Sequence, residues 1–280
     1  MSQAESVRIL VAEDDLRIRI VLERLLAVRG HEVVSAVNGR EALDLVDESG
    51  PFDLVITDVN MPELGGEELL RRLKRLHPEL PVIVLTARKD PGLITEVFKD
   101  GAYRFLPKPF TGEDLYKVVE GALHEGRRGV GEAVASVDAE GWVELTAPSR
   151  QEYLDRFQDF CDQLIASRLD EQAKTELKIA VQEMGQNAIE WGNSMQEESR
   201  VKLSYRLLED RILIRIEDEG RGFDPSQVPD PTVDPVRLIE ERETQGKRPG
   251  GFGIHLARRI MDRMEYNERG NVVTMEKRFA

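Results

Sequence analysis

Short apolar runs alternate with helical patterns over the first 125 residues of the chain. The runs lie at 7–12, 32–36, 52–57, 81–86 and 103–107. Between them, apolar residues recur at helical spacing over 15–28, 39–48, 66–76, 91–100 and 113–124. Because the runs are apolar on both faces, they predict strands of a parallel sheet that helices cover on both sides. We therefore predict a doubly wound, five-stranded α/β domain over residues 1–125.

The pattern changes after this domain. Residues 126–141 are small and polar without a period, so we interpret them as a linker that partly extends the preceding helix. The elements predicted beyond it are a strand at 142–146, helices at about 150–168 and 171–192, strands at 199–209 and 211–218, a helix at about 251–264 and a strand at 271–279. Strands and helices alternate less regularly here, which predicts a second, α+β sandwich domain over 142–280.

Length and charge narrow the range of functions. A chain of 280 residues is most simply two domains. The net charge is −14, with 16 basic and 23 acidic residues over 1–125 and 23 basic and 30 acidic residues over the remainder. Neither part carries the positive charge that binding to a phosphate backbone requires, so direct binding of DNA or RNA is disfavoured.

The pattern also bears on the cellular compartment. No run of about 18 apolar residues occurs, so we expect no membrane span. The N-terminus lacks the basic segment and apolar core of a secretory signal, and we expect a cytoplasmic protein. The single cysteine, Cys161, lies beside Phe157, Phe160 and Leu164, where we expect a buried and unreactive thiol.

Polar residues gather where the strands of the first domain end. Glu13 and Asp14 follow the first strand, Asp58 follows the third, Thr86 ends the fourth and Lys108 follows the fifth. The carboxyl ends of parallel strands meet at one edge of a sheet, so we expect these side chains to lie together. Clustered carboxylates repel one another, and a hard cation such as Mg²⁺ relieves the repulsion. A lysine and a hydroxyl beside them suit the stabilisation of an incoming phosphoryl group.

The segments ILVAEDD, LVITDVNMPELGG, VIVLTA and LPKPF occur in this order. Over about residues 6–124 they resemble the receiver domains of bacterial two-component response regulators, which have a flavodoxin-like fold. The resemblance implies that a histidine kinase or phosphotransfer protein phosphorylates Asp58. It also implies roles for Glu13, Asp14 and the carbonyl of Asn60, which with Asp58 would hold Mg²⁺, for Thr86 and Lys108, which would bind the phosphoryl group, and for Phe105, the aromatic switch.

A polar pair interrupts the helix predicted over 171–192. Glu183 and Asn187 lie one turn apart beside the apolar stripe, so their side chains leave the same face about 6 Å apart. Further on, Asp218 ends an apolar strand, and glycine-rich segments follow it and open the next helix. Each glycine motif alone is more often a turn or a flexible helix start. Together these features suit a nucleotide, because a glycine-fed helix N-terminus binds phosphates and a carboxylate accepts a hydrogen bond from adenine.

This set resembles the ATP-binding fold shared by gyrase, Hsp90, histidine kinases and MutL (the GHKL type) over about residues 142–279, and within it the anti-sigma-factor serine kinases. The resemblance implies an α/β sandwich that binds Mg²⁺-ATP. The site residues that it implies are Glu183 as general base, Asn187 as Mg²⁺ ligand, Asp218 with Gly220 and Gly222 at adenine, and Gly251 and Gly253 at the phosphates. Residues from about 225 to 249 would form the ATP lid, and Lys247 and Arg248 at its end are phosphate partners or solvated charges.

Other side chains fit the resemblance less closely. Trp191 stands where this family often has histidine, and Arg156 on the first helix is interpreted as a surface salt bridge or as a contact to the γ-phosphate. His124 is interpreted as a surface residue, because the span from it to residue 142 cannot hold a two-helix dimerisation hairpin. We expect His255 to pack within its helix, with a phosphate contact as the alternative.

Two hypotheses follow from these features. The first is a phosphorylation-controlled response regulator whose output domain binds Mg²⁺-ATP and acts as an anti-sigma-like serine/threonine protein kinase or partner-switching regulator. Its partner would be a sigma factor or an antagonist-like protein. The second is a non-catalytic, ATP-dependent protein-interaction module under the same control. Glu183 favours catalysis, because a module that only binds needs the metal and base contacts alone. Both families form dimers, so the resemblance is compatible with a homodimer.

Overall fold

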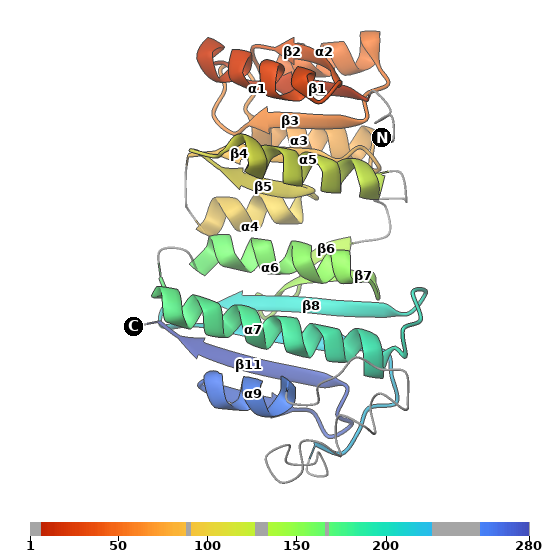
Figure 1. Ribbon diagram of the computed structural model, residues 1–280, viewed down its shortest axis with the longest axis vertical. Helices are drawn as coiled ribbons and strands as arrows, with labels where there is room; N and C mark the ends of the chain where they lie inside the picture. The colour runs from red at the N-terminus through yellow and green to blue at the C-terminus, as the bar shows by residue number, and fades with distance from the viewer. Residues whose placement is uncertain (1–6, 88–90, 127–133, 166–167, 226–252, 280) are drawn as a thin grey trace. The chain divides into compact units, whose positions relative to one another are not determined.

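The chain divides into two compact units, Met1–Glu132 and Ala133–Ala280 (Figure 1). The computed structural model describes residues 7–87, 91–126, 134–165, 168–225 and 253–279. Within these residues, no helix has both the length and the apolar character needed to cross a bilayer.

The first unit contains the five parallel strands that the apolar pattern predicts. The strands are β1 (Arg8–Ala12), β2 (Glu32–Ala36), β3 (Leu54–Asp58), β4 (Val82–Thr86) and β5 (Arg104–Pro107). The helices between and after them are α1 (Leu16–Val28), α2 (Gly39–Ser49), α3 (Gly66–Leu76), α4 (Pro91–Lys99) and α5 (Gly112–Gly126). The strand order is β2-β1-β3-β4-β5, so the strand order reverses between β1 and β3. In open α/β sheets, ligands bind where the order reverses.

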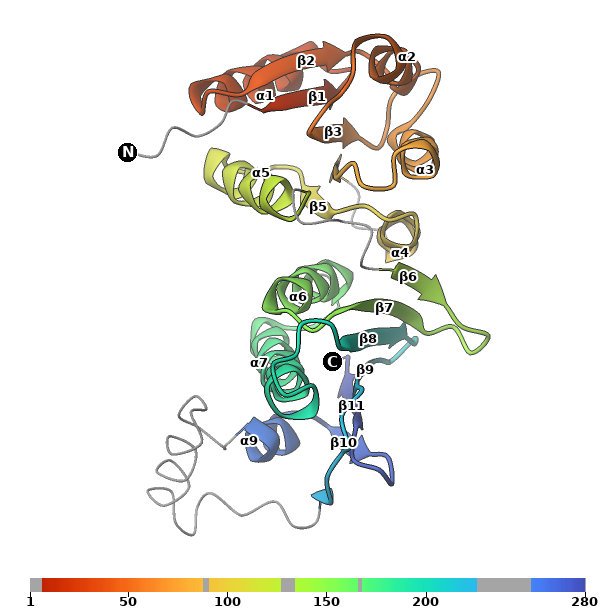
Figure 2. The same cartoon turned by 90° about the vertical axis from the view of Figure 1, so that its right-hand side faces the viewer.

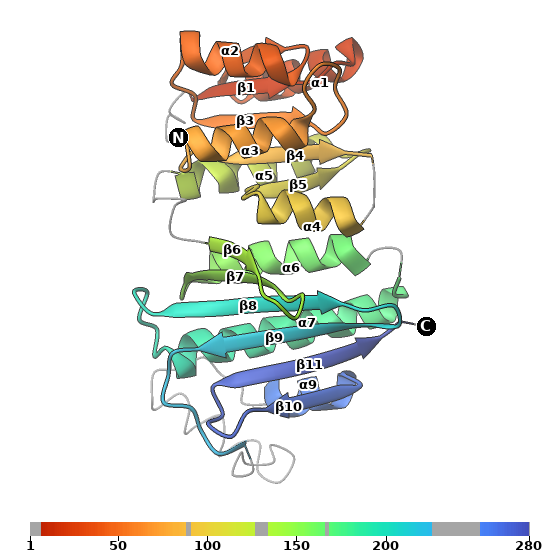
Figure 3. The same cartoon turned by 180° about the vertical axis from the view of Figure 1, so that it is seen from behind.

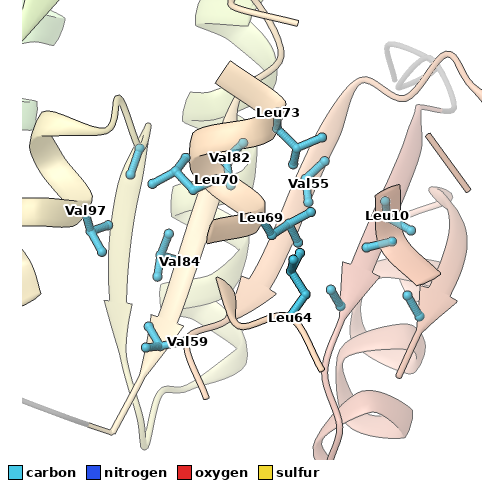
Figure 4. Close-up of a cluster of buried hydrophobic side chains, with 14 of the residues drawn as sticks. Leu10, Val55, Val59, Leu64, Leu69, Leu70, Leu73, Val82, Val84 and Val97 are labelled. Carbon is cyan, nitrogen blue, oxygen red and sulfur yellow. The ribbon is translucent and has the colours of Figure 1, made fainter. Parts of the chain in front are cut away.

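Helices cover both faces of this sheet. Helices α1 and α5 lie on one face, and α2, α3 and α4 lie on the other (Figures 1 and 3). Every residue of β3 and β4 is buried, as expected for strands between two helical layers. Figure 4 shows one of the two cores, in which Leu69, Leu70 and Leu73 of α3 pack with Val55 and Val82 of the sheet. These apolar layers hold the carboxyl ends of the strands in place.

The second unit is built on an antiparallel sheet. Its strands are β6 (Val134–Val137), β7 (Val143–Pro148), β8 (Arg200–Leu207), β9 (Arg211–Asp218), β10 (Arg263–Tyr266) and β11 (Val272–Arg278). Its helical elements are α6 (Gln151–Ile165), α7 (Glu171–Asn187), the π-helical turn η2 (Ala188–Gly192) and α9 (Gly253–Ile260). The strand order is β10-β11-β9-β8-β7-β6, and each strand is antiparallel to its neighbours.

Helices α6, α7 and α9 lie on one face of this sheet (Figure 2). Along β9, buried Ile212, Ile214 and Ile216 alternate with half-buried residues, because one face of the strand meets the helices. This confirms the predicted α/β sandwich. Cys161 on α6 is buried as expected, and burial raises the pKa of its thiol.

The prediction of a linker as far as residue 141 is wrong for Val134–Val137. These residues form β6, which pairs with β7 in the register Ala135 opposite Leu145. The hairpin between the two strands is held by Asp138, whose carboxylate accepts the backbone N–H of Trp142 at 2.9 Å. A strand of four residues is too short to show a clear alternation of apolar and polar side chains. Its pairing with β7 depends on the turn at Asp138, which the apolar pattern does not reveal.

The prediction of a helix over about 251–264 is wrong at its end. Helix α9 stops at Ile260, and Arg263–Tyr266 forms the edge strand β10 against β11. Along β10, Met264 and Tyr266 are half-buried and alternate with exposed residues, which is a strand pattern four residues long. A pattern this short cannot be told from a last helical turn by periodicity alone.

Replacing Leu154 with alanine should destabilise the second unit by about 2–5 kcal/mol. The Leu154 side chain is fully buried and fills the space above Gly185, where helices α6 and α7 approach closely. Urea unfolding followed by circular dichroism measures the loss. Leu256→Ala on α9 is the control, because that side chain is 39% exposed and its removal leaves no enclosed cavity. Equal losses for the two variants would contradict the assigned packing.

Candidate functional site

The acidic cluster predicted for the first unit forms at the carboxyl ends of its central strands. Glu13 directly follows β1 and is 1% exposed, Asp58 ends β3 and is 6% exposed, and Asp14 is exposed. One carboxylate oxygen from each of these residues lies within 4.8 Å of the others. The parallel register explains this convergence, since β1 and β3 are neighbours that end level with each other.

Lys108 forms ion pairs with both buried acids. Its Nζ donates hydrogen bonds to Oε2 of Glu13 and to Oδ1 of Asp58, both at 2.7 Å. Burial acts to lower the pKa of Lys108, but its two carboxylate partners outweigh burial, and the pKa is raised. Burial also raises the pKa of Glu13, against the effect of Lys108. The lysine is therefore held as a cation beside Asp58.

The other predicted residues of this unit are Asn60, Thr86 and Phe105, which lie on or directly after the strands that end at this cluster. The backbone N–H of Asn60 donates to Oδ2 of Asp58 at 3.0 Å. Thr86 is fully buried at the end of β4, and its carbonyl accepts the N–H of Lys108 at 2.7 Å. Phe105 lies on β5 opposite Val84, with its half-buried ring packed against the core of Figure 4. The strands thus bring Glu13, Asp14, Asp58 and Lys108 together, and Thr86 meets Lys108 through its backbone.

The donor set of this cluster fits Mg²⁺. Mg²⁺ prefers carboxylate oxygens and keeps several waters. Glu13 and Asp58 offer buried oxygens, while Asp14 is exposed and leaves one side of the cluster open to water. Lys108 balances part of the negative charge of the two buried acids.

In the second unit, Glu183 of helix α7 lies against the start of α9. Gly253, the first residue of α9, is so close to Glu183 that a Cβ on the glycine would meet the Glu183 carboxylate. Asn187 is one turn further along and is the last α-helical residue. The carboxylate therefore takes the space that any side chain at position 253 would need.

Helix α7 does not end as an ordinary α-helix. It continues as η2, where the backbone N–H of Asn193 bonds to the carbonyl of Ala188 at 2.8 Å, five residues back. The prediction of one helix over 171–192 is therefore correct in length, but its hydrogen-bond pattern changes at Asn187. Gly192, the last residue of η2, faces the carboxylate of Asp218 with no room for a Cβ between them. Turns of this kind are rare and are often found at functional sites.

Asp218 lies at the end of β9, half-buried. Its Oδ1 accepts the N–H of Gly220 at 2.9 Å, and its backbone N–H donates to the carbonyl of Asn271, directly before the neighbouring strand β11. Burial raises the pKa of Asp218 to about 6, although the Gly220 N–H and the charge of Arg269 act in the opposite direction. Gly222 follows with a φ of +76°, which a residue with a side chain rarely adopts.

Aromatic side chains flank this turn. The rings of Phe223 and Tyr266 meet edge to face with centroids 5.1 Å apart. The Tyr266 hydroxyl donates to Sδ of Met184 on α7 at 3.4 Å, and burial raises the pKa of that hydroxyl. Phe223 is 40% exposed, so one apolar face beside the turn remains open.

Some predicted residues lie outside the part of the chain that the structure describes. These are Gly251, Lys247, Arg248 and the lid segment beyond residue 225. Arg156 is 6% exposed, so its interpretation as a surface salt bridge is wrong. His124 is exposed and His255 is half-buried.

Sequence reasoning missed two buried asparagines beside Asp218. Asn193 is 4% exposed and Asn271 is 8% exposed, and both bond to the backbone of the turn that begins at Asp218. Asn193 directly follows Gly192 in the segment EWGN. A glycine followed by an asparagine at the end of a helix was the available signal, and it is equally typical of a solvent-exposed cap.

Both parts of the chain match known domain families. Residues 9–120 match the family model described as the response regulator receiver domain. Residues 147–277 match the model described as the histidine kinase-like ATPase domain. The chain joins a receiver domain to a histidine kinase-like ATPase domain.

Several known proteins resemble part of the chain. It is 39% identical over 113 residues to the DNA-binding transcriptional regulator NtrC of Escherichia coli (strain K12). The matched segment covers 40% of this chain and 24% of NtrC. It is 45% identical over 109 residues to the response regulator MprA of Mycolicibacterium vanbaalenii, covering 39% of this chain and 47% of MprA. A receiver domain protein of Clostridium thermocellum, known from its crystal structure, is 33% identical with a TM-score of 0.42, covering 44% of this chain and 98% of that one. The chain thus spans about a quarter of the length of NtrC and half that of MprA.

Replacing Asp218 with asparagine should raise the thermal stability of the ATPase domain, and more so near pH 8 than near pH 5. The pKa of the carboxyl is raised from 3.8 to about 6 in the folded protein. Its contribution to stability is therefore fully present below pH 3.8 and is lost as the pH rises through about 6. Asparagine stays neutral and keeps an acceptor for the Gly220 N–H, so it avoids that loss. Calorimetric unfolding at the two pH values measures the difference.

The control for this variant is Asp210→Asn. Arg211 lowers the pKa of Asp210, so the sign of the pH effect is opposite there. Its ionised form contributes stability at neutral pH, and that contribution is lost as the pH falls through the lowered pKa. A stability gain near pH 8 in the Asp210 variant, or none in the Asp218 variant, would show that the assigned environment of Asp218 is wrong.

Proposed function

We propose that phosphorylation of Asp58 controls an ATPase domain that binds Mg²⁺-ATP and transfers its γ-phosphoryl group to a serine or threonine of a partner protein, in the manner of an anti-sigma-factor kinase. The partner is a sigma factor or an antagonist-like protein, and binding and release of that partner form the output. The contact between Glu183 and the first residue of α9 carries this proposal.

In the receiver domain, a carboxylate oxygen of Asp58 attacks the phosphorus atom of a phosphohistidine. The new O–P bond forms as the N–P bond breaks, and the imidazole leaves. Lys108 already bonds to Asp58 and is placed to pair with the phosphoryl oxygens. Glu13, Asp14 and Asp58 would hold Mg²⁺, which supplies positive charge to the transferring group. The oxygens of the new phosphoryl group then compete with the Glu13 carboxylate for the hydrogen bonds of Lys108. This change of partner gives the switch a physical basis.

In the ATPase domain, the roles follow from position. The first N–H groups of a helix lack partners within it, so the start of α9 favours the phosphates of a nucleotide. Glu183 lies at this helix start, where it can accept the proton of an attacking hydroxyl. Asn187, one turn along α7, would hold Mg²⁺ through its amide oxygen. Asp218, whose carboxylate lies beside Gly192 and Gly220, would accept a hydrogen bond from the amino group of adenine.

One continuous helix contacts both ends of this proposed site. Glu183 meets Gly253 at the phosphate end, and Gly192 meets Asp218 at the base end. These two positions are separated by roughly 13 Å of helix axis, a distance that a nucleoside triphosphate can span. The helix thus sets the spacing between the group that would read the base and the group that would act on the phosphate.

Mg²⁺-ATP should bind the full chain, and beryllofluoride on the receiver domain should shift the affinity. Beryllofluoride mimics a phosphoryl group on Asp58, so its effect reports coupling between the domains. Isothermal titration calorimetry with and without beryllofluoride measures both quantities. Asp58→Asn is the control, because it removes the acceptor and leaves ATP binding intact. Folded protein that binds no Mg²⁺-ATP in either state would rule out the kinase function.

Glu183→Ala should abolish transfer of label from γ-labelled ATP to a protein substrate, while ATP still binds. Loss of a general base typically costs about 10²–10⁴-fold in rate. Phosphoryl transfer followed by autoradiography measures the rate, and calorimetry measures the binding. Glu171→Ala, an exposed acid at the other end of the same helix, should leave both unchanged. If wild-type protein binds ATP but transfers no label, the domain is the non-catalytic interaction module.

A further inference from the structure

Asn193 bonds to the ends of three strands at once. Its Nδ2 donates to the hydroxyl of Ser149 after β7 at 3.1 Å and to the carbonyl of Arg200 at the start of β8 at 2.8 Å. Its Oδ1 accepts the backbone N–H of Glu219 after β9 at 2.9 Å. Each hydrogen-bonding atom of this buried amide is thus engaged, and each partner comes from a different strand.

The turn from Asp218 to Gly220 is held by side chains on both sides. Besides the bond from Glu219 to Asn193, the carbonyl of Asp218 accepts Nδ2 of Asn271 at 2.9 Å. The carbonyl of Gly220 accepts Arg269 at 2.8 Å. The Glu219 carboxylate in turn accepts the N–H of Arg200 at 2.9 Å. Of these side chains, Asn193 alone follows directly from the helix that carries Glu183 and Asn187.

The π-helical turn explains why Asn193 reaches Glu219. In a continued α-helix, the N–H of Asn193 would bond to the carbonyl four residues back, but it bonds to Ala188, five residues back. The wider turn brings Gly192 against Asp218 and Gly220, where neither glycine could carry a Cβ. Asn193 directly follows Gly192, which lies against both of these residues.

We propose that Asn193 is a positioning residue for nucleotide-base recognition, which fixes the Asp218–Gly220 turn to the end of the α7–η2 helix and so sets Asp218 at the distance from Asn187 that adenine requires. This inference rests on the proposed ATP site. Asn193 touches the turn and not the nucleotide. Its removal should therefore disturb the base end of the site and leave the phosphate end, formed by Glu183, Asn187 and Gly253, unchanged.

The test compares three ligands on the full chain. Calorimetry with Mg²⁺ measures the affinity of ATP, of GTP and of inorganic tripolyphosphate, which has no base. In Asn193→Ala, ATP should bind about tenfold more weakly and the preference for ATP over GTP should fall, because a buried hydrogen-bond network is lost at the base end. Tripolyphosphate should bind as it does to the wild type. Parallel weakening of all three ligands, or an unchanged ATP preference, would overturn the proposal.

Gln158→Ala is the matched control. Gln158 is also a buried amide of the ATPase domain, and its Nε2 donates to the carbonyl of Lys178 at 2.8 Å. Its loss should lower stability without altering the ATP preference. Gly192→Ala serves as the second variant if Asn193→Ala does not fold. Alanine favours the helix, yet its Cβ would displace the Asp218 carboxylate, so the ATP preference should fall here too.

A measurement without nucleotide separates this proposal from the proposed function. Hydrogen exchange of the Glu219 amide reports the bond to Asn193 directly. Asn193→Ala should remove the protection of that amide, and Gln158→Ala should keep it. If the wild type binds none of the three ligands, the ATP site is wrong. Protection of Glu219 that survives in Asn193→Ala would then show that Asn193 does not position the turn.

Discussion

Both domains place carboxylates at strand ends and must keep them charged while they are partly or wholly buried. In the receiver domain, Lys108 meets this requirement with two ion pairs that tie the end of β5 to the ends of β1 and β3. Among the described residues of the ATPase domain, Asp218 has no such lysine partner; its carboxylate accepts the N–H of Gly220, and the charge of Arg269 acts on it without a direct bond. Burial raises the pKa of Asp218 to about 6, and it raises the pKa of Glu13 as well in spite of Lys108, so the domains differ in the partner of the carboxylate. The carboxylates of Glu13 and Asp58 are stabilised by Lys108 before any phosphoryl group arrives. The Asp218 carboxylate has fewer partners, so a hydrogen bond from an amino group would stabilise its charged form further.

The sequence allowed the parallel sheet to be predicted almost to the residue, because strands buried on both faces are apolar throughout and their ends are marked by polar residues. The same logic found Glu13, Asp58 and Lys108, since parallel topology alone brings such ends together. The short edge strands β6 and β10 were missed because four residues carry little periodicity and their pairing partners are distant or turn-dependent. The π-helical turn was missed for another reason: a change in hydrogen-bond register leaves the apolar stripe of the helix intact.

Two glycines of the ATPase domain make room for carboxylates where the α7–η2 helix meets α9 and the end of β9. Glycine at 253 admits the Glu183 carboxylate, and glycine at 192 admits that of Asp218. Neither contact depends on positive φ; each depends on the absence of a side chain. The functional meaning of these glycines is therefore steric complementarity to a carboxylate, which no pattern of spacing along the chain reveals. Arg156 illustrates the converse, because its charge suggested a surface position and the packing of α6 buried it.

The two tryptophans of the chain, Trp142 and Trp191, both belong to the ATPase domain. Trp142 is buried beneath Arg215, whose guanidinium lies 3.9 Å from the ring centroid, whereas Trp191 is 39% exposed on the π-helical turn beside Gly192. The receiver domain is thus dark to selective indole excitation. Any emission change that follows phosphorylation of the receiver must originate in the other domain, so the natural chain carries its own optical reporter of communication between sensor and output.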